Sequence, residues 1–160
     1  MTYRITGLSP ETFAPLFALD EAELAAHRAV RVTASASRGF PCRVSLEDAR
    51  EGEELILLHH TSHDVASPYR SGYAIYVRDN ATDAAQYIDA IPPVFEGRPL
   101  ALRGFGADAM LKDAKLALPG EADTAIRTLL ADPRIAYIHA HNAAHGCFAA
   151  QIERFEESAQ

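Results

Sequence analysis

The chain has 160 residues and a formal net charge of -7, and a chain of this length can bury a hydrophobic core without disulfide or metal staples. Its 48% of hydrophobic and 23% of charged residues are typical of a globular protein, and its lysines and arginines occur singly. These features exclude a disordered chain and the basic stripe of a nucleic-acid-binding protein. We therefore expect one domain over residues 1–160 and no nucleic-acid partner.

The sequence also gives an expectation for the cellular compartment of the protein. Residues 1–13 lack the basic start, apolar run and small-residue cleavage site of a signal peptide. No stretch approaches the roughly 18 consecutive apolar residues that span a bilayer. We expect a cytoplasmic protein without a membrane partner, in which Cys42 and Cys147 are free thiols, because a reducing compartment disfavours structural disulfides.

The first third of the chain is predicted to mix strands with short helical segments. In order, these are a strand at 2–8, a short helix that starts at Ser9 and has Phe13, Leu16 and Phe17 on its apolar side, a segment at 20–27 that continues this helix or starts a second one, and a strand at 29–35. Ser9 followed by Pro10 is typical of a helix start. In the second strand, alternation predicts that Val30 and Val32 point inward.

The middle of the chain is predicted to be mostly strand. The segments are 54–60, 73–79, 99–105 and 109–118. The last of these is compatible with a helix or a strand, and its alternation favours a strand. Residues 54–60 are apolar on both faces, as in a central strand covered on both sides. Pro92 and Pro93 interrupt the pattern and predict a turn or a single helical turn, since proline cannot donate to a strand ladder.

The clearest helix is predicted at residues 120–133. Ala122, Ile126 and Leu129 recur on one helical face, and Pro133 ends the helix. Strands outnumber helices and do not alternate with them in βα units. We therefore predict an α+β fold, with a mostly antiparallel mixed sheet flanked by two or three helices.

Polar residues capable of chemistry gather near the end of the chain. Residues 137–150, YIHAHNAAHGCFAA, include three histidines, one asparagine and one of the two cysteines. Strands at 135–141 and 147–155 around a short loop predict an antiparallel hairpin, in which Gly146 supplies a positive φ.

The expected register places Cys147 opposite His141 and Ala149 opposite His139. Directly opposed residues share a face. One face then carries Tyr137, His139, His141, Cys147, Gln151 and Glu153. The other carries Ala136, Ile138, Ala140, Phe148, Ala150 and Ile152.

A metal site is one interpretation of the polar face. An H-x-H pair on a strand turns both rings to the same side, so His139 and His141 are candidate ligands. A third ligand could come from Cys147 or from the histidine-rich segment that contains His59, His60 and His63. Thiolate and imidazole ligands would suit zinc, with iron and copper as other transition-metal candidates.

Thiol chemistry is the second interpretation. Cys147 would be the nucleophile and His141 its base, with Asn142 or Glu153 orienting the base. We expect Cys147 to be more reactive than Cys42, which alternates as a residue on the buried side of its strand. The third interpretation is structural: the histidines form local hydrogen bonds, both cysteines are packing or surface residues, and the protein is a non-catalytic module.

Several further residues are candidates for binding a small molecule. Tyr137 and Asn142 belong to the hairpin, and Cys42 and Arg43 lie in the segment GFPCRVS. Arg70, in SPYRSGY, could hold an anionic ligand through its bidentate guanidinium. A charge inside an apolar strand needs a partner, so Arg43 and Arg103 are instead expected to form structural ion pairs with nearby acids. The candidate acids are Glu47, Asp48 and Asp108.

Three stretches together resemble a bacterial family known as domain of unknown function 1203. They are GFPCRVSLEDA, SPYRSGYAIYVRD and RIAYIHAHNAAHGCFAAQIER. The resemblance covers nearly the whole chain and implies a small single-domain cytoplasmic protein. It implies no activity, substrate, cofactor or catalytic residue.

Overall fold

A computed structural model describes residues 1–157 and shows two antiparallel sheets. The α+β class is confirmed, but the strands divide between two sheets instead of forming one. The six-stranded sheet has the order β5 (Gln86–Ile88), β1 (Tyr3–Thr6), β9 (Phe148–Arg154), β8 (Tyr137–Asn142), β6 (Leu100–Phe105) and β7 (Leu111–Ala117). The three-stranded sheet has the order β2 (Ala29–Thr33), β3 (Glu54–His63) and β4 (Ser71–Arg78).

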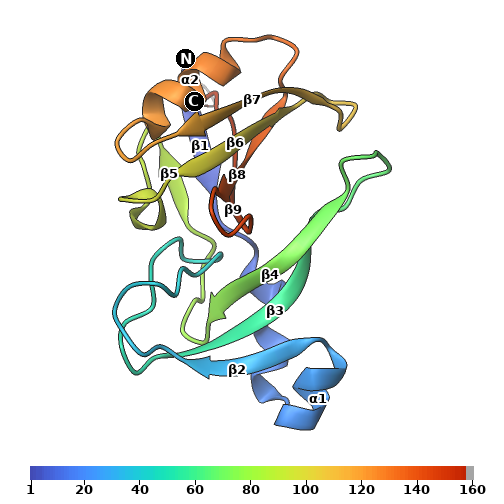
Figure 1. Ribbon diagram of the computed structural model, residues 1–160, viewed down its shortest axis with the longest axis vertical. Helices are drawn as coiled ribbons and strands as arrows, with labels where there is room; N and C mark the ends of the chain where they lie inside the picture. Colours follow the sequence, from blue (N-terminus) through green and yellow to red (C-terminus); the bar gives the residue numbers. More distant parts are fainter. Residues whose placement is uncertain (158–160) are drawn as a thin grey trace.

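Each sheet has its own helix. The helix α2 (Ala122–Leu130) packs on the six-stranded sheet at the top of Figure 1, and α1 (Glu21–Ala26) adjoins β2 at the bottom. Three 3-10 turns complete the fold: η1 (Pro10–Thr12), η2 (Ala14–Ala18) and η3 (Pro93–Phe95). No helix among residues 1–157 is long and apolar enough to cross a membrane.

Local sequence explains where the helices lie. Asp20 and Glu23 form a capping box at the start of α1, which satisfies backbone N–H groups that the first turn leaves free. In α2, the predicted apolar face is buried, with Ile126 at 0% exposure. The turn predicted at the two prolines is η3.

One predicted orientation is wrong, because Val30 is 56% exposed. It lies on β2, an outer strand of its sheet, where only one face is covered and alternation cannot say which. The short strand β5 escaped prediction because three residues are too few to show a period.

A loop at residues 39–49 connects the two cores. Leu46 packs in the core of the six-stranded sheet, whereas Cys42 and Val44 pack in the core beneath the three-stranded sheet. The loop forms a backbone hydrogen bond with each sheet region. Arg43 N donates to Tyr76 O of β4, and Arg43 O accepts from Leu8 N just after β1. The sheets are therefore held in a fixed relation by one segment.

The C-terminal hairpin exists, but its predicted register is wrong. Tyr137 pairs with Glu153 and His139 with Gln151, a shift of two residues. A β-bulge follows Ala140, so that His141 pairs with Phe148. An extra residue on one strand reverses the faces beyond it.

Because of the bulge, Phe148 and Ala149 lie on the opposite faces from those predicted. Phe148, predicted on the apolar face, lies with its ring centroid 5.0 Å from that of His139. Ala149, predicted beside His139, instead joins the core of the six-stranded sheet. Cys147 pairs with Asn142 through the bond from Asn142 N to Cys147 O, at 2.9 Å, and not with His141.

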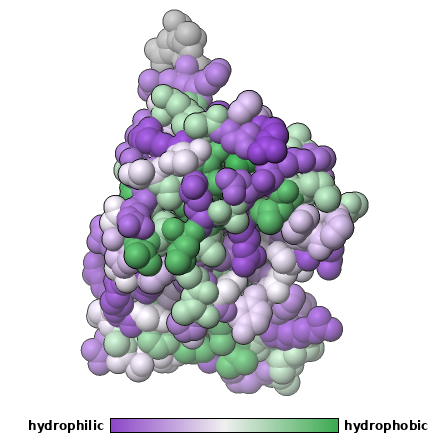
Figure 2. Space-filling model, turned by 45° about the horizontal axis from the view of Figure 1, so that its top comes forward, coloured by the Kyte–Doolittle hydropathy of each residue, from purple (hydrophilic) through white to green (hydrophobic). Residues whose placement is uncertain are grey.

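Ile135 and Ala136 also exchange places relative to the prediction. Ile135 is fully buried in the core, and Ala136 is exposed before β8 begins. Over the face drawn in Figure 2, hydrophobic residues form small patches among hydrophilic ones.

Candidate functional site

A pocket of about 370 Å³ lies between the two sheets. One wall is the loop between β8 and β9, residues 142–147, which turns towards β4 (Figure 1). Leu57, Tyr73 and Tyr76 of the three-stranded sheet form the opposite wall, and parts of the 39–43 loop close one side. The volume falls in the range of small-molecule sites.

The pocket brings Cys147 and Arg43 together. Arg43 Nη2 donates to Cys147 Sγ at 3.1 Å. The other guanidinium nitrogens hold the arginine in place: Nη1 donates to Pro41 O at 2.7 Å and Nε donates to Phe148 O. Arg43 is 1% exposed, so its contact with sulfur is shielded from water.

Arg43 has no acidic partner among residues 1–157. The expected ion pairs are wrong, because Asp48 pairs with Arg98, Glu47 pairs with Arg78 and Asp108 pairs with Lys112. Burial lowers the pKa of Arg43, and the neighbouring Cys147 sulfur opposes that shift. Cys147 is therefore the side chain that contacts the buried guanidinium, whose other hydrogen bonds go to backbone carbonyls.

Asn142 is the third polar residue of this arrangement. Its Nδ2 donates towards Cys147 Sγ at 3.5 Å, and its side chain is 8% exposed. Its Oδ1 is buried and has no hydrogen-bond partner in the described structure. Cys147 thus receives donors from two side chains, and Asn142 retains acceptor capacity.

The predicted histidines lie in a separate aromatic cluster between the sheets. His63, at the end of β3, bonds Tyr69 O through Nδ1 at 2.8 Å. This makes Nδ1–H the donor, so Nε2 accepts from the Tyr137 hydroxyl at 2.7 Å. The ring of His139 lies 4.9 Å from that of His63. The two histidine-rich segments of the sequence are therefore in contact: the rings of His63 and His139 pack together, and His63 is hydrogen-bonded to Tyr137.

His141 is held at the edge of this cluster. Its Nδ1 bonds Gly146 O at 2.9 Å, and its Nε2 faces Arg103 Nη1 at 3.4 Å. Burial, together with repulsion from Arg103 and Arg43, lowers the pKa of His141 to about 4. Burial and nearby His63 lower the pKa of His139 to about 4. Both rings are therefore neutral at neutral pH.

The arrangement of the ring nitrogens is unlike a metal site. Both nitrogens of His63 and of His141 have polar partners, and His139 Nε2 faces Gln151 Oε1 at 3.3 Å. Only His139 Nδ1 lacks a partner in the cluster. Within residues 1–157, no group of three or more His, Cys, Asp or Glu side chains is placed to hold a metal ion.

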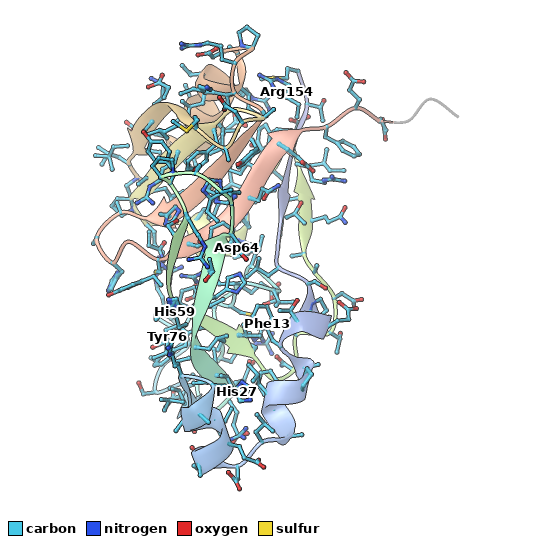
Figure 3. The ribbon with its side chains drawn as sticks, turned by 90° about the vertical axis from the view of Figure 1, so that its right-hand side faces the viewer. Phe13, His27, His59, Asp64, Tyr76 and Arg154 are labelled. Carbon is cyan, nitrogen blue, oxygen red and sulfur yellow. The ribbon has the colours of Figure 1, made fainter. Side chains whose placement is uncertain are left out.

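Other predicted residues lie away from the pocket. Cys42 is fully buried and its sulfur accepts Arg78 N at 3.3 Å. Arg70 is on an exposed loop and pairs with Asp64. Figure 3 shows Asp64 higher than His59, towards the six-stranded sheet.

The remaining two histidines of β3 lie on opposite faces of the three-stranded sheet. His60 packs against Phe13, with ring centroids 5.5 Å apart. His59 lies with Tyr76 on the other side, away from Phe13, as Figure 3 shows. Among the described residues, neither ring packs against His139 or His141.

Several pocket residues escaped sequence analysis. They are Leu57, Tyr76, Arg98 and His145. Three of these come from segments distant in sequence, and only the meeting of two sheets makes them neighbours. His145 could have been predicted, because it lies in the hairpin loop two positions before Cys147.

Comparison with known proteins gives a family. Searches of curated proteins and of solved structures found no match. The family model described as "Protein of unknown function (DUF1203)" matches residues 39–154. This range begins at the loop that carries Arg43 and ends with β9, so it includes the walls of the pocket. The chain therefore belongs to the DUF1203 family.

Proposed function

We propose that this protein binds a small molecule in the pocket between its sheets, and that Cys147 is the reactive group of the site. The observation that carries the proposal is the 3.1 Å contact between Arg43 Nη2 and Cys147 Sγ. A neighbouring guanidinium favours the thiolate, which is the nucleophilic form of cysteine.

The burial of the two partners supports this role. Arg43 is almost completely buried, whereas Cys147 is partly exposed and lines the pocket. The positive charge is therefore shielded from water, while the sulfur can be reached. Both cysteines are free, in keeping with a protein of the cytoplasm, where thiols are kept reduced.

The chemistry does not need a histidine base at the sulfur. His141, the base expected from the sequence, bonds Gly146 O and faces Arg103. In the proposed site, Arg43 and Asn142 stabilise the thiolate by donating hydrogen bonds. A metal at His139 and His141 is not part of the proposal.

Brief alkylation of the native protein with iodoacetamide, a small neutral reagent, tests the proposal. Peptide mapping should find Cys147 labelled well before Cys42. The Cys147→Ser variant should take up no label on the same timescale, and urea-unfolded protein should be labelled at both cysteines. Preferential labelling of Cys42, or no labelling before unfolding, would show that the pocket has no reactive thiol.

A further inference from the structure

We propose that Cys147 exchanges with low-molecular-weight disulfides that carry carboxylates, and that the pocket retains one half of such a compound as a mixed disulfide. This inference rests on the proposed function, because it requires a reactive Cys147. It adds the class of compound and the bond that forms.

The charge of the pocket selects for anions. Among residues 1–157 no aspartate or glutamate lines it, although the whole chain carries a net charge of -7. Arg98 also lines the pocket, but Asp48 neutralises it through bonds of 2.7 and 3.0 Å. Arg43 has no such carboxylate in the described structure. Its charge is therefore the one that remains without a counter-charge when Sγ is part of a disulfide.

The exchange step is balanced without any additional oxidant. The Cys147 thiolate attacks one sulfur of the disulfide R–S–S–R, and a new bond forms between Sγ and that sulfur. The original S–S bond breaks, and its electron pair leaves with the second half as the thiolate RS⁻, which takes a proton from water. Cys147 is oxidised to the mixed disulfide, and the released half is reduced.

Formation of the mixed disulfide changes the electrostatics of Arg43. In the mixed disulfide Sγ cannot ionise, so the buried guanidinium has no anionic partner at this 3.1 Å contact. A carboxylate on the attached half can take its place, and guanidinium and carboxylate form strong charge-assisted hydrogen bonds. A neutral or cationic half leaves Arg43 uncompensated, which is costly for a buried charge.

The walls provide space for the attached half. Leu57 and Tyr76 offer apolar and aromatic surface, and Tyr73, which is 58% exposed, stands at the open side. A volume of about 370 Å³ accommodates a compound with several heavy atoms beyond the sulfur.

The chain has no second thiol placed to reverse the reaction. Cys42 is the other cysteine, and it is 0% exposed in the core beneath the three-stranded sheet. A mixed disulfide at Cys147 therefore persists until a thiol from solution reduces it.

The test compares three disulfides of different charge on the intact, reduced protein. They are oxidised glutathione, which is anionic, bis(2-hydroxyethyl) disulfide, which is neutral, and cystamine, which is cationic. Intact mass follows the addition of one half to Cys147. A synthetic peptide covering residues 143–151, which contains Cys147 alone, gives the intrinsic rate of each reagent, and Cys147→Ser controls for other sites.

After division by the peptide rates, oxidised glutathione should react about tenfold or more faster than cystamine, with the neutral disulfide between them. The preference should shrink in high salt less than it does for the peptide, because a buried charge is screened less. Equal normalised rates, or a preference for cystamine, would overturn the inference.

The outcomes also separate this inference from the proposed function. If iodoacetamide labels Cys147 rapidly but the three disulfides show no charge preference, the reactive thiol stands and the inference fails. If Cys147 resists iodoacetamide as well as every disulfide, both fail.

Discussion

The two cysteines show how burial decides the role of a residue type. Cys42 has no exposed surface, and its sulfur accepts backbone N–H groups of Val44 and Arg78. Cys147 lines a pocket and receives donors from two polar side chains. The sequence correctly predicted that Cys42 is the buried cysteine, but the strand on which that prediction rested is a loop of isolated bridges and turns, in which Arg43 is buried as well. It could not reveal Arg43 beside Cys147, because the two are 104 positions apart.

Replacing each cysteine by serine should destabilise the protein for two different reasons. Cys42→Ser should lower the free energy of unfolding by about 1–3 kcal/mol, because it places a hydroxyl in an apolar core. Cys147→Ser should also lower it, because serine does not ionise and leaves the buried guanidinium of Arg43 without an anionic partner. Urea titrations of both variants measure this, and an unchanged stability of Cys147→Ser would contradict the charge pairing with Arg43.

The buried histidines make stability depend on pH. His139 and His141 have a pKa of about 4 in the folded protein, against 6.5 for an ordinary histidine. The unfolded chain binds more protons between these values, so the stabilisation is present above 6.5 and is lost as pH falls towards 4. The loss should reach about 3 kcal/mol for each histidine at the acid end.

Urea unfolding between pH 6.5 and about 5, above the ordinary range of carboxylates, isolates the histidine contribution. His139→Gln should flatten the slope of stability against pH. His145→Gln is the matched control, because His145 is exposed, and it should leave the slope unchanged. The same slope in wild type and His139→Gln would contradict the account.

At the scale of elements, the β-bulge in β9 sets which side chains face the histidines. It puts Phe148 between the rings of His139 and His141 and sends Ala149 into the core. Hydrophobic alternation correctly predicted the hairpin, but it cannot locate a bulge, because Phe148 and Ala149 are both apolar and either can face the core. The predicted pairing of Cys147 with His141 failed because the strands pair two residues further along β9 than expected, and the bulge then brings Phe148 opposite His141.

The junction between β1 and the 39–49 loop is also an element-scale feature. A Cβ added at Gly7 would lie 2.1 Å from Val44 O. Because the obstacle is backbone, it cannot turn aside as a side chain would. Gly7→Ala should therefore cost about 3 kcal/mol or more, and exposed Ser9→Ala should cost less than about 0.5 kcal/mol. Similar midpoints in urea for the two variants would show that this contact is not tight.

At the scale of the whole molecule, the pocket exists because two sheets meet across one loop. The sequence predicted the α+β class and most strands, since the strong apolar runs and the turn residues are local signals. The division into two sheets depends on long-range pairing of strands such as β1 with β9, and no local pattern encodes it. The pocket walls could not be predicted for the same reason.

One domain over the chain remains a prediction, and the shared loop gives it a physical basis. Leu46 lies in one core and Val44 in the other, so neither core can open without disturbing this segment. Hydrogen exchange followed by mass spectrometry should therefore show β3 and β8 losing protection at the same urea concentration. Separate transitions for the two strands would indicate two independent units.

The central claim is that buried Arg43 makes Cys147 reactive, and the alkylation rate of Cys147 in Arg43→Met tests it most directly. Methionine fills much of the same space without charge, and a folded fraction confirmed by circular dichroism ensures that native protein is compared. With iodoacetamide at one neutral pH, Cys147 should react about tenfold or more slowly in Arg43→Met than in wild type. Equal or faster labelling of Cys147 in the folded variant would contradict the account.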